Sequence, residues 1–311
     1  MAARRRIVVD TDPGQDDAVA LLIALASPEL DVAAITTVAG NVPLDLTTRN
    51  ALMMVELADR RDVPVFAGCS RPMVRPLRTA EYVHGPTGID GVDRPEPELE
   101  PRDSHAVDAL IELLGAGGVT VCTLGPQTNL AMAMVKAPEI VAGIDEIVMM
   151  GGGFFEGGNV TPAAEFNIYV DPHAAHVVFT SGVPITMMPL DVTHQALTSD
   201  ERVRRFRELG TAAGTAVAGM LDFFDRYDEA KYGTDGAPLH DPCVIAYLLQ
   251  PDLFAGRRCH VAIENHSEAT MGMTLVDWWG VTGNEPNAMV MNQIDDGRFY
   301  DLLVERIGRL S

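Results

Sequence analysis

Four carboxylates lie close together near the start of the chain. Residues 7–22 read IVVDTDPGQDDAVALL, so Asp10, Asp12, Asp16 and Asp17 stand between an apolar run and a run rich in Ala and Leu. Carboxylates this close repel one another, and a hard cation is their natural neutraliser. Ligation by oxygen alone favours Ca²⁺ or Mg²⁺ over zinc or copper, which prefer nitrogen and sulfur. A helix N-cap with a charged first turn would explain one or two of these aspartates, but not Asp12, Asp16 and Asp17 together.

The residues around the aspartates predict a tight strand-to-helix turn. Residues 7–9 are β-branched and continuous, as in a strand buried on both faces, and residues 17–26 favour a helix. A Pro-Gly pair marks the turn between them. This arrangement places Asp12 at the carboxyl end of the strand. It places Asp16 and Asp17 at the start of the helix, where exposed N–H groups and the macrodipole stabilise anions.

The same alternation of apolar runs and helical periodicity continues to Leu190. It predicts an α/β fold with a mostly parallel central sheet flanked by helices. Three further runs, residues 260–265, 272–278 and 288–294, predict small antiparallel strands near the C-terminus, before a last helix over residues 295–309. No linker rich in Pro, Gly or Ser divides the chain, so we expect residues 1–311 to form a single domain.

Several residues lie at the predicted carboxyl ends of strands: Asp12, Asn41, Leu124, Met150 and Asp191. In open α/β sheets, ligands bind in the crevice outside these ends. We therefore expect these residues to converge on one site.

Composition excludes several classes of partner. A net charge of -21 with a pI of about 4.6 disfavours nucleic acid and anionic membranes, which both attract basic proteins. The longest apolar run, residues 18–26, is far shorter than a membrane span. Four scattered cysteines without CxxC spacing predict reduced thiols and a cytoplasmic protein.

The string DTDPGQDDAVA resembles the signature of the nucleoside hydrolases, of the inosine-uridine preferring and pyrimidine nucleoside hydrolase type. Matching motifs continue to about Pro242 and fade after it. The resemblance implies a nucleoside hydrolase fold, which is Rossmann-like, and hydrolysis of the N-glycosidic bond of purine or pyrimidine ribonucleosides (uridine, inosine, cytidine) for nucleoside salvage. It also implies Ca²⁺ as the cofactor and a homodimer or homotetramer.

The resemblance further implies roles for the acidic residues. The implied Ca²⁺ ligands are Asp12, Asp17, the backbone carbonyl of Leu124, and Asp241. Asp16 would be the general base toward a water polarised by the ion. His240 would donate a proton to the leaving base, since imidazole titrates near neutrality.

Substrate contacts follow from the same resemblance. The ribose would be bound by Asn41, Met150, Asn159, Glu165 and Asn167. Glu165 can only accept hydrogen bonds, whereas the asparagines both donate and accept, which suits sugar hydroxyls. His84, in a His-Gly-x-x-Gly loop, would contact the base, although residues alone favour a surface histidine. Tyr227 and Tyr232 precede a Gly-Thr-Asp-Gly sequence, and this position predicts that one of them closes over the base. The role of His194 stays open, and packing behind the site is favoured.

Two other functions remain open at the level of sequence. One is a Ca²⁺-dependent protein that binds a ribosyl ligand without cleaving it. The other is a phosphohydrolase of the haloacid dehalogenase type, whose nucleophile motif resembles Asp10-Thr11-Asp12. The Pro-Gly pair that follows departs from that motif and counts against it.

Overall fold

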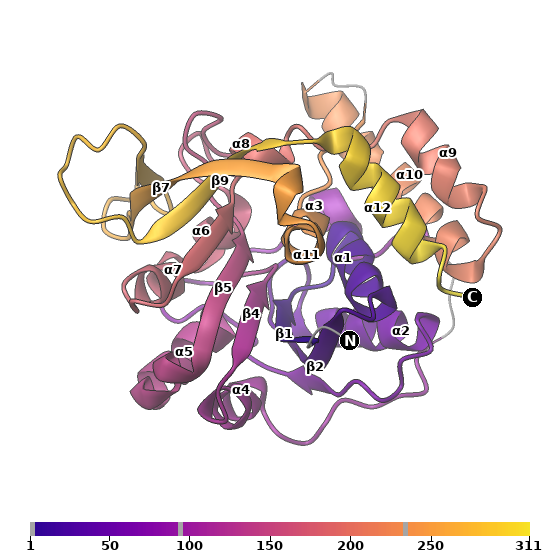
Figure 1. Ribbon diagram of the computed structural model, residues 1–311, viewed down its shortest axis with the longest axis horizontal. Coiled ribbons are helices and arrows are strands. Elements are labelled where there is room, and N and C mark those ends of the chain that lie inside the picture. The colour runs from indigo at the N-terminus through magenta and orange to yellow at the C-terminus, as the bar shows by residue number, and fades with distance from the viewer. Residues whose placement is uncertain (1–3, 93–95, 233–235) are drawn as a thin grey trace.

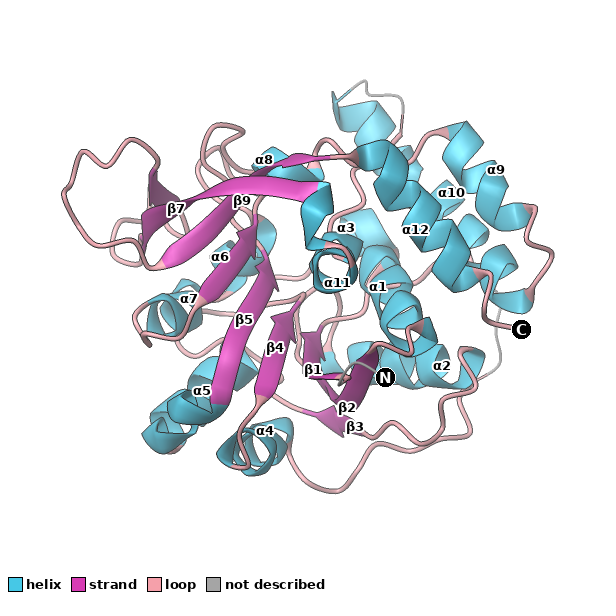
Figure 2. Cartoon of the chain, in the orientation of Figure 1, coloured by secondary structure: helices cyan, strands magenta, loops and turns pink. Residues whose placement is uncertain are grey.

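The computed structural model describes residues 4–92, 96–232 and 236–311, and for residues 225–232 it describes the backbone alone. Within these residues the strands form one nine-stranded sheet (Figure 1, Figure 2). The strands are β1 (Arg5–Thr11), β2 (Leu30–Thr37), β3 (Val65–Ala67), β4 (Val119–Thr123), β5 (Ile144–Met150), β6 (Ile185–Met188), β7 (Phe254–Ile263), β8 (Thr274–Asp277) and β9 (Ala288–Ile294).

The order of the strands is β3-β2-β1-β4-β5-β6-β9-β7-β8. All neighbours from β3 to β9 pair in parallel. β7 pairs antiparallel with both β9 and β8. β7 and β8 are therefore antiparallel as predicted. β9 is antiparallel to β7 but parallel to β6, so the prediction describes only one of its two pairings. An apolar run does not encode which neighbour it will pair with.

Helices cover both faces of the sheet. One face carries α1 (Gln15–Ala26), α2 (Leu44–Leu57), α9 (Asp200–Arg207), α10 (Ala212–Tyr232), α11 (Pro242–Leu249) and α12 (Asp296–Ile307). The other carries α4 (Ala106–Gly115), α5 (Thr128–Lys136) and α7 (Pro172–Phe179). Three short helices, α3 (Glu81–His84), α6 (Phe166–Val170) and α8 (Leu190–Thr193), and two 3₁₀ turns, Pro138–Gly143 and Pro251–Leu253, complete the described elements.

Each strand of the parallel region contributes to two apolar clusters. On β1, Ile7 and Val9 face the cluster around α1, whereas Val8 faces the cluster around α4 and α5. On β5, Val148 faces the cluster around α1, and Ile147 faces the cluster around α4 and α5. Because successive side chains point to opposite faces, burial of both faces explains the continuous apolar runs.

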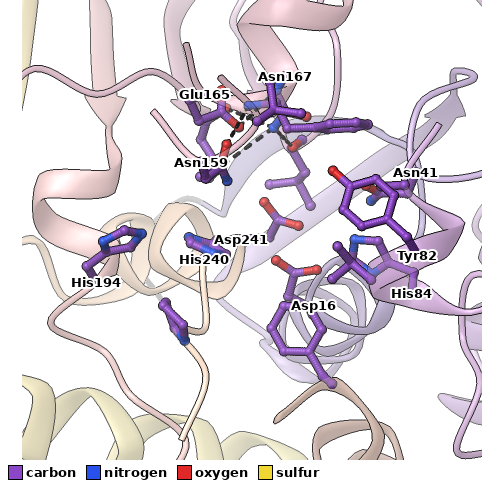
Figure 3. A pocket seen from close by; sticks show the side chains of 18 residues that line it. Asp16, Asn41, Tyr82, His84, Asn159, Glu165, Asn167, His194, His240 and Asp241 are labelled. Atoms are coloured by element: carbon purple, nitrogen blue, oxygen red, sulfur yellow. Dashed lines mark hydrogen bonds between the residues drawn. The ribbon is translucent and has the colours of Figure 1, made fainter. Parts of the chain in front are cut away.

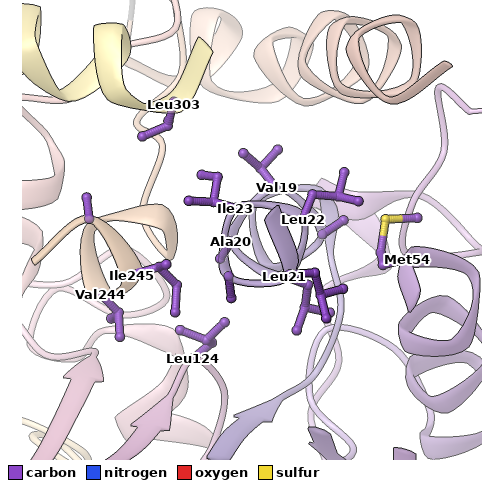
Figure 4. Close-up of a cluster of buried hydrophobic side chains, with 14 of the residues drawn as sticks. Val19, Ala20, Leu21, Leu22, Ile23, Met54, Leu124, Val244, Ile245 and Leu303 are labelled. Carbon is purple, nitrogen blue, oxygen red and sulfur yellow. The ribbon is translucent and has the colours of Figure 1, made fainter. Parts of the chain in front are cut away.

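α1 is the most enclosed helix of its face. Every residue from Gln15 to Leu25 is buried. Its side chains lie among those of Met54 on α2, Ile245 on α11 and Leu303 on α12 (Figure 4). Burial of one Leu or Ile side chain contributes about 1.5–3 kcal/mol, so this packing holds the N-terminus of α1 firmly at the edge of the sheet.

The segment from Thr198 to Lys231 contains two helices. α9 and α10 are separated near Gly210, whose φ of 67° is the left-handed conformation that glycine adopts readily. The described helices include none with the length and apolar character needed to cross a bilayer.

Candidate active site

A cavity opens at the carboxyl ends of the parallel strands (Figure 3). It brings together these predicted site residues: Asp16, Asn41, His84, Leu124, Met150, Asn159, Glu165, Asn167, His240 and Asp241. Asp12 and Asp17 are fully buried and do not line it. Tyr227 and Tyr232 belong to α10, but their side chains lie outside the described residues.

Three buried carboxylates form a cluster, and two of them, Asp16 and Asp241, line this cavity. Asp16, Asp17 and Asp241 each place an oxygen within 4.8 Å of the others. The first two come from the start of α1, and Asp241 precedes α11. Although Asp241 occupies the N-cap position of α11, its side chain makes no capping hydrogen bond. The carboxylate therefore points to the cluster and not to its own helix.

Asp17 is held by hydrogen bonds from the turn that it follows. Its carboxylate accepts from the Thr11 hydroxyl, from the N–H groups of Asp12 and Gly14, and from Nδ2 of Asn41. The contact with Gly14 also caps α1, which is why the helix begins at Gln15. The sequence indicated an anion at this helix start, and the structure adds the donors that orient it.

Asp12 lies outside the tight group but close to it. One oxygen, Oδ2, accepts the backbone N–H of Asn41 at 2.7 Å. The other, Oδ1, is buried and has no hydrogen-bond partner in the described part of the chain. A Cβ at Gly40 would lie 2.0 Å from Oδ2, and one at Gly125 would lie 2.1 Å from Oδ1. Both glycines are needed so that two loop backbones can approach this carboxylate.

Burial and mutual repulsion destabilise the ionised forms of the clustered aspartates. Burial, with the charge of Asp17, raises the pKa of Asp16 to about 8. Burial raises the pKa of Asp12 and Asp241 well above the usual value, and neighbouring aspartates add to both shifts. The described cavity lining contains no Lys or Arg, and Asp16 Oδ1, like Asp12 Oδ1, is buried without a partner. Oxygen donors without a cationic side chain fit a hard divalent ion.

The polar wall beside the cluster is built around α6. Glu165 caps this helix and accepts the N–H groups of Gly152, Asn167 and Ile168. Burial raises its pKa to about 7. Glu165 therefore has a structural role that the sequence did not indicate, since its three donors hold the glycine-rich segment against α6.

Asn159 and Asn167 belong to the same wall. Asn159 Oδ1 accepts the N–H of Phe166 at 3.0 Å. Asn167 Nδ2 donates to the carbonyl of Leu124 at 2.6 Å, and more weakly to that of Met150 at 3.4 Å. Leu124 belongs to the cavity lining, and its carbonyl oxygen already accepts one hydrogen bond.

Histidines stand on opposite sides of the cavity (Figure 3). His84 ends α3, and its ring stacks on Phe224 at 5.6 Å. Burial lowers the pKa of His84 to about 3, so its ring is neutral. On the other side, Nδ1 of His240 hydrogen-bonds the hydroxyl of Thr193 at 2.7 Å. His194, expected behind the site, lines the cavity and contacts the ring of His240.

Sequence reasoning missed several contributors. Phe224 and Tyr82 line the cavity. Gln15 and Thr193 hold the two histidines. Gln15 directly follows the Pro-Gly pair of the turn. No local pattern shows that its side chain reaches His84, which lies 69 positions further along the chain.

Asp10 lies outside the cavity lining. Its Oδ1 accepts from Thr36 and Asn129 at 2.6 and 2.8 Å, and burial raises its pKa to about 6. A phosphatase nucleophile must reach its substrate, so this burial counts against that alternative.

The sequence model of the inosine-uridine preferring nucleoside hydrolases matches residues 7–301. The chain belongs to this family. It is 52% identical over 308 residues to an uncharacterised protein of Schizosaccharomyces pombe, with 98% of this chain and 99% of that one covered. It is 49% identical to the pyrimidine-specific ribonucleoside hydrolase RihA of Enterobacter sp. (strain 638), with 98% of each chain covered.

A solved structure agrees. The purine-preferring ribonucleoside hydrolase from Gardnerella vaginalis superposes with a TM-score of 0.92 at 33% identity, covering 98% of each chain. The predictions of family, of fold class and of an N-glycosyl hydrolase are therefore confirmed. This nucleoside hydrolase cleaves the N-glycosidic bond of ribonucleosides. Its family is metal-dependent, and the acidic cluster that a metal would require is present.

Proposed function

We propose that this nucleoside hydrolase is Ca²⁺-dependent and releases pyrimidine and purine bases from ribonucleosides. The observation that carries the proposal is the buried group of Asp16, Asp17 and Asp241. It lies in one cavity with a polar wall suited to ribose and with histidines suited to a base.

The ion would be held by Asp12, Asp17, the Leu124 carbonyl and Asp241. Carboxylates combined with a backbone carbonyl suit the flexible coordination of Ca²⁺ better than the rigid octahedron of Mg²⁺. When bound, Ca²⁺ supplies Lewis acidity that makes a water easier to deprotonate and an anchor for ribose hydroxyls. Asp12 Oδ1 and Asp16 Oδ1 are buried and have no hydrogen-bond partner within the described part of the chain, which supports a cation here.

Asp16 would act as the general base. It belongs to the cavity lining, and its Oδ1 has no hydrogen-bond partner among the described residues. Burial and the neighbouring charge of Asp17 raise its pKa to about 8. A carboxylate whose pKa lies near the working pH takes a proton from water more effectively than an ordinary aspartate. The water then attacks the anomeric carbon of the ribose as the bond to the base breaks.

His240 would give a proton to the leaving base. Thr193 engages Nδ1 and so orients the ring, and imidazole is the side chain that exchanges protons most readily near neutrality. His84, with Tyr227 or Tyr232, would contact the base. Asn41, Met150, Asn159, Glu165 and Asn167 would orient the ribose.

Base preference is proposed from the relatives. RihA, named as pyrimidine-specific, is 49% identical, whereas the purine-preferring enzyme is 33% identical. We therefore place uridine and cytidine before inosine as substrates, in nucleoside salvage. The four cysteines are free thiols, which suits the cytoplasm.

Assembly is the last part of the proposal: residues 1–311 form one catalytic domain, and this domain forms a homodimer or homotetramer. An aromatic patch supports assembly, because Phe155 and Trp279 are 66% and 72% exposed beside Trp278. Large exposed aromatic side chains are common at protein interfaces. Light scattering should give a mass of two or four chains, and a monomer would refute assembly.

A substrate panel tests the function. Uridine, cytidine, inosine, adenosine and 2′-deoxyuridine are incubated with metal-stripped enzyme, with and without added CaCl₂, and release of ribose and base is measured. We expect Ca²⁺-dependent release from uridine and cytidine above inosine, and poor turnover of the deoxynucleoside. Tight binding of uridine without release would favour the ribosyl-binding alternative, and phosphate release from a phosphate ester would favour a phosphatase.

A further inference from the structure

Gln15 is a buried polar side chain between the acidic turn and His84. Its Nε2 donates to the backbone carbonyls of His84 and Asp90 at 2.9 and 3.2 Å. Carbonyl oxygens can only accept, so these two contacts fix which end of the amide faces them. The other end, Oε1, consequently faces Nδ1 of His84 at 2.7 Å.

This contact selects one tautomer of His84. Oε1 can only accept, so Nδ1 must carry the proton and donate it. The ring is neutral because burial lowers the pKa of His84 to about 3. A neutral imidazole carries one proton, so the second nitrogen, Nε2, is left as an acceptor. Among the described residues, Gln15 is the hydrogen-bond partner of this ring.

The ring is also held in place on its faces and edges. A Cβ at position 14 would lie 2.5 Å from Nδ1, so the glycine there allows the imidazole to approach the turn. Phe224 stacks against the ring at 5.6 Å, with 27° between the planes. His84 therefore presents one orientation and one acceptor to the cavity that it lines.

We propose that Gln15 is a positioning residue that fixes His84 as a hydrogen-bond acceptor, so that the cavity selects nucleobases that present an N–H group to Nε2. The inference rests on the proposed function, in which His84 contacts the base. A ring N–H, as at position 3 of uracil, or an exocyclic amine satisfies this acceptor. A base methylated at that nitrogen leaves it unpaired in a buried site, which a hydrogen-bonding site penalises strongly.

Kinetics with three nucleosides test the proposal. Uridine and 5-methyluridine keep the ring N–H, whereas 3-methyluridine lacks it and carries a methyl group of the same size. For the unaltered enzyme, we expect kcat/KM for 3-methyluridine to be at least about tenfold below that for 5-methyluridine. Equal values for the two methylated nucleosides would overturn the inference. If uridine itself were not hydrolysed, the proposed function would fail instead.

The variant Gln15→Met separates positioning from general structure. It has a similar length but cannot hold the tautomer, so kcat/KM for uridine should fall about tenfold, mainly through KM. Turnover of 3-methyluridine, which makes no bond to Nε2, should change less than about twofold. Loss of both activities by one factor would contradict the proposal.

Asn50→Leu is the matched control. Asn50 is a fully buried amide that also joins the turn to the loop after His84, donating to the carbonyls of Pro13 and Thr87 at 3.0 and 2.8 Å. It makes no hydrogen bond to the His84 ring. We expect Asn50→Leu to affect uridine and 3-methyluridine by the same factor.

A spectroscopic measurement on the unaltered enzyme does not depend on any variant being active. With ¹⁵N-labelled histidine, the His84 resonances are identified by their loss in His84→Gln. We expect a protonated Nδ1 and an unprotonated Nε2. The opposite tautomer, or exchange between the two, would overturn the proposal even if Gln15→Met failed to fold.

Discussion

At Asp16, burial and charge act in the same direction. The side chain is 5% exposed, and the carboxylate of Asp17 lies beside it. Both raise the free energy of the ionised form, which makes Asp16 a better proton acceptor than an exposed aspartate. Thr11 and Asn41 donate hydrogen bonds to Asp17, whereas Asp16 Oδ1 is buried without a hydrogen-bond partner among the described residues. The two neighbouring carboxylates therefore have different environments, which supports the different roles proposed for them.

The change Asp16→Asn tests the base. The amide has the same shape but cannot take a proton, so kcat for uridine should fall by about 10²–10⁴, while Ca²⁺ affinity measured by calorimetry changes little. The control is Asp10→Asn, a buried carboxylate near the end of β1 that lies outside the cavity lining. Its kcat should stay within about tenfold of the unaltered enzyme. Near-normal turnover by Asp16→Asn would show that another group is the base.

The change His240→Ala tests proton donation to the leaving group. Uridine and inosine should lose about 10²–10⁴ in kcat, because their bases leave poorly as anions. A riboside of p-nitrophenol needs no such proton, because its phenolate leaves unaided. Its turnover by His240→Ala should remain close to that of the unaltered enzyme. A similar loss on both kinds of substrate would instead assign His240 to binding.

At the scale of elements, two loops meet at one carboxylate. Gly40 follows β2 and Gly125 follows β4, and both backbones approach Asp12 from opposite sides. β1 lies between β2 and β4 in the sheet, so the convergence follows from strand order. The position of Asp12 is therefore set by three elements at once.

The change Gly125→Ala should disturb this arrangement. The new Cβ would lie 2.1 Å from Asp12 Oδ1, so the carboxylate or the loop must move. We expect a loss of about 1–3 kcal/mol in the free energy of unfolding and at least tenfold weaker Ca²⁺ binding. Gly115→Ala is the matched control at the end of α4, because no atom lies within 4 Å of its Cβ. That change should leave Ca²⁺ affinity unchanged and should raise the free energy of unfolding by about 0.4–1 kcal/mol, because alanine loses less conformational freedom than glycine on folding.

The sequence predicted those parts of the site that local patterns encode. The turn between β1 and α1 could be predicted because apolar runs, Pro13, Gly14 and clustered aspartates all occur within a few residues. The contact of Gln15 with His84 joins residues 69 positions apart, and no local pattern specifies such a contact. For the same reason the parallel pairing of β9 with β6 emerged only from the assembled sheet.

At the scale of the molecule, the fold brings buried carboxylates together at the carboxyl ends of the parallel strands. Residues that follow β1, β2 and β4 (Asp16, Asn41 and Leu124) line the cavity together with Met150 at the end of β5. The two apolar clusters cover both faces of the sheet. The protein already carries a net charge of -21, so burying more carboxylates at this edge opposes folding. A bound cation would relieve this repulsion, and stability should therefore depend on both Ca²⁺ and pH.

The sign of that dependence follows from the raised pKa values. Without Ca²⁺, the folded protein holds protons on Asp16, Glu165 and Asp10 up to pKa values of about 8, 7 and 6. In the unfolded chain the same groups lose their protons near pH 4. Their contribution to stability is thus fully present below about pH 4 and is lost as the pH rises through the folded values. Metal-free protein should accordingly have a lower Tm at about pH 8 than at about pH 5.

Ca²⁺ binds the ionised carboxylates, so its effect must run the other way. Adding CaCl₂ to metal-free protein should raise Tm by more at about pH 8 than at about pH 5, where protons compete for the same oxygens. Differential scanning fluorimetry across this range measures both effects. Gly125→Ala, with its weakened site, should show a smaller increase at each pH. A Ca²⁺-induced increase in Tm that is the same at every pH would mean that the ion binds elsewhere. Ca²⁺ binding depends on pH in this range only if its ligands are carboxylates that also bind protons in this range.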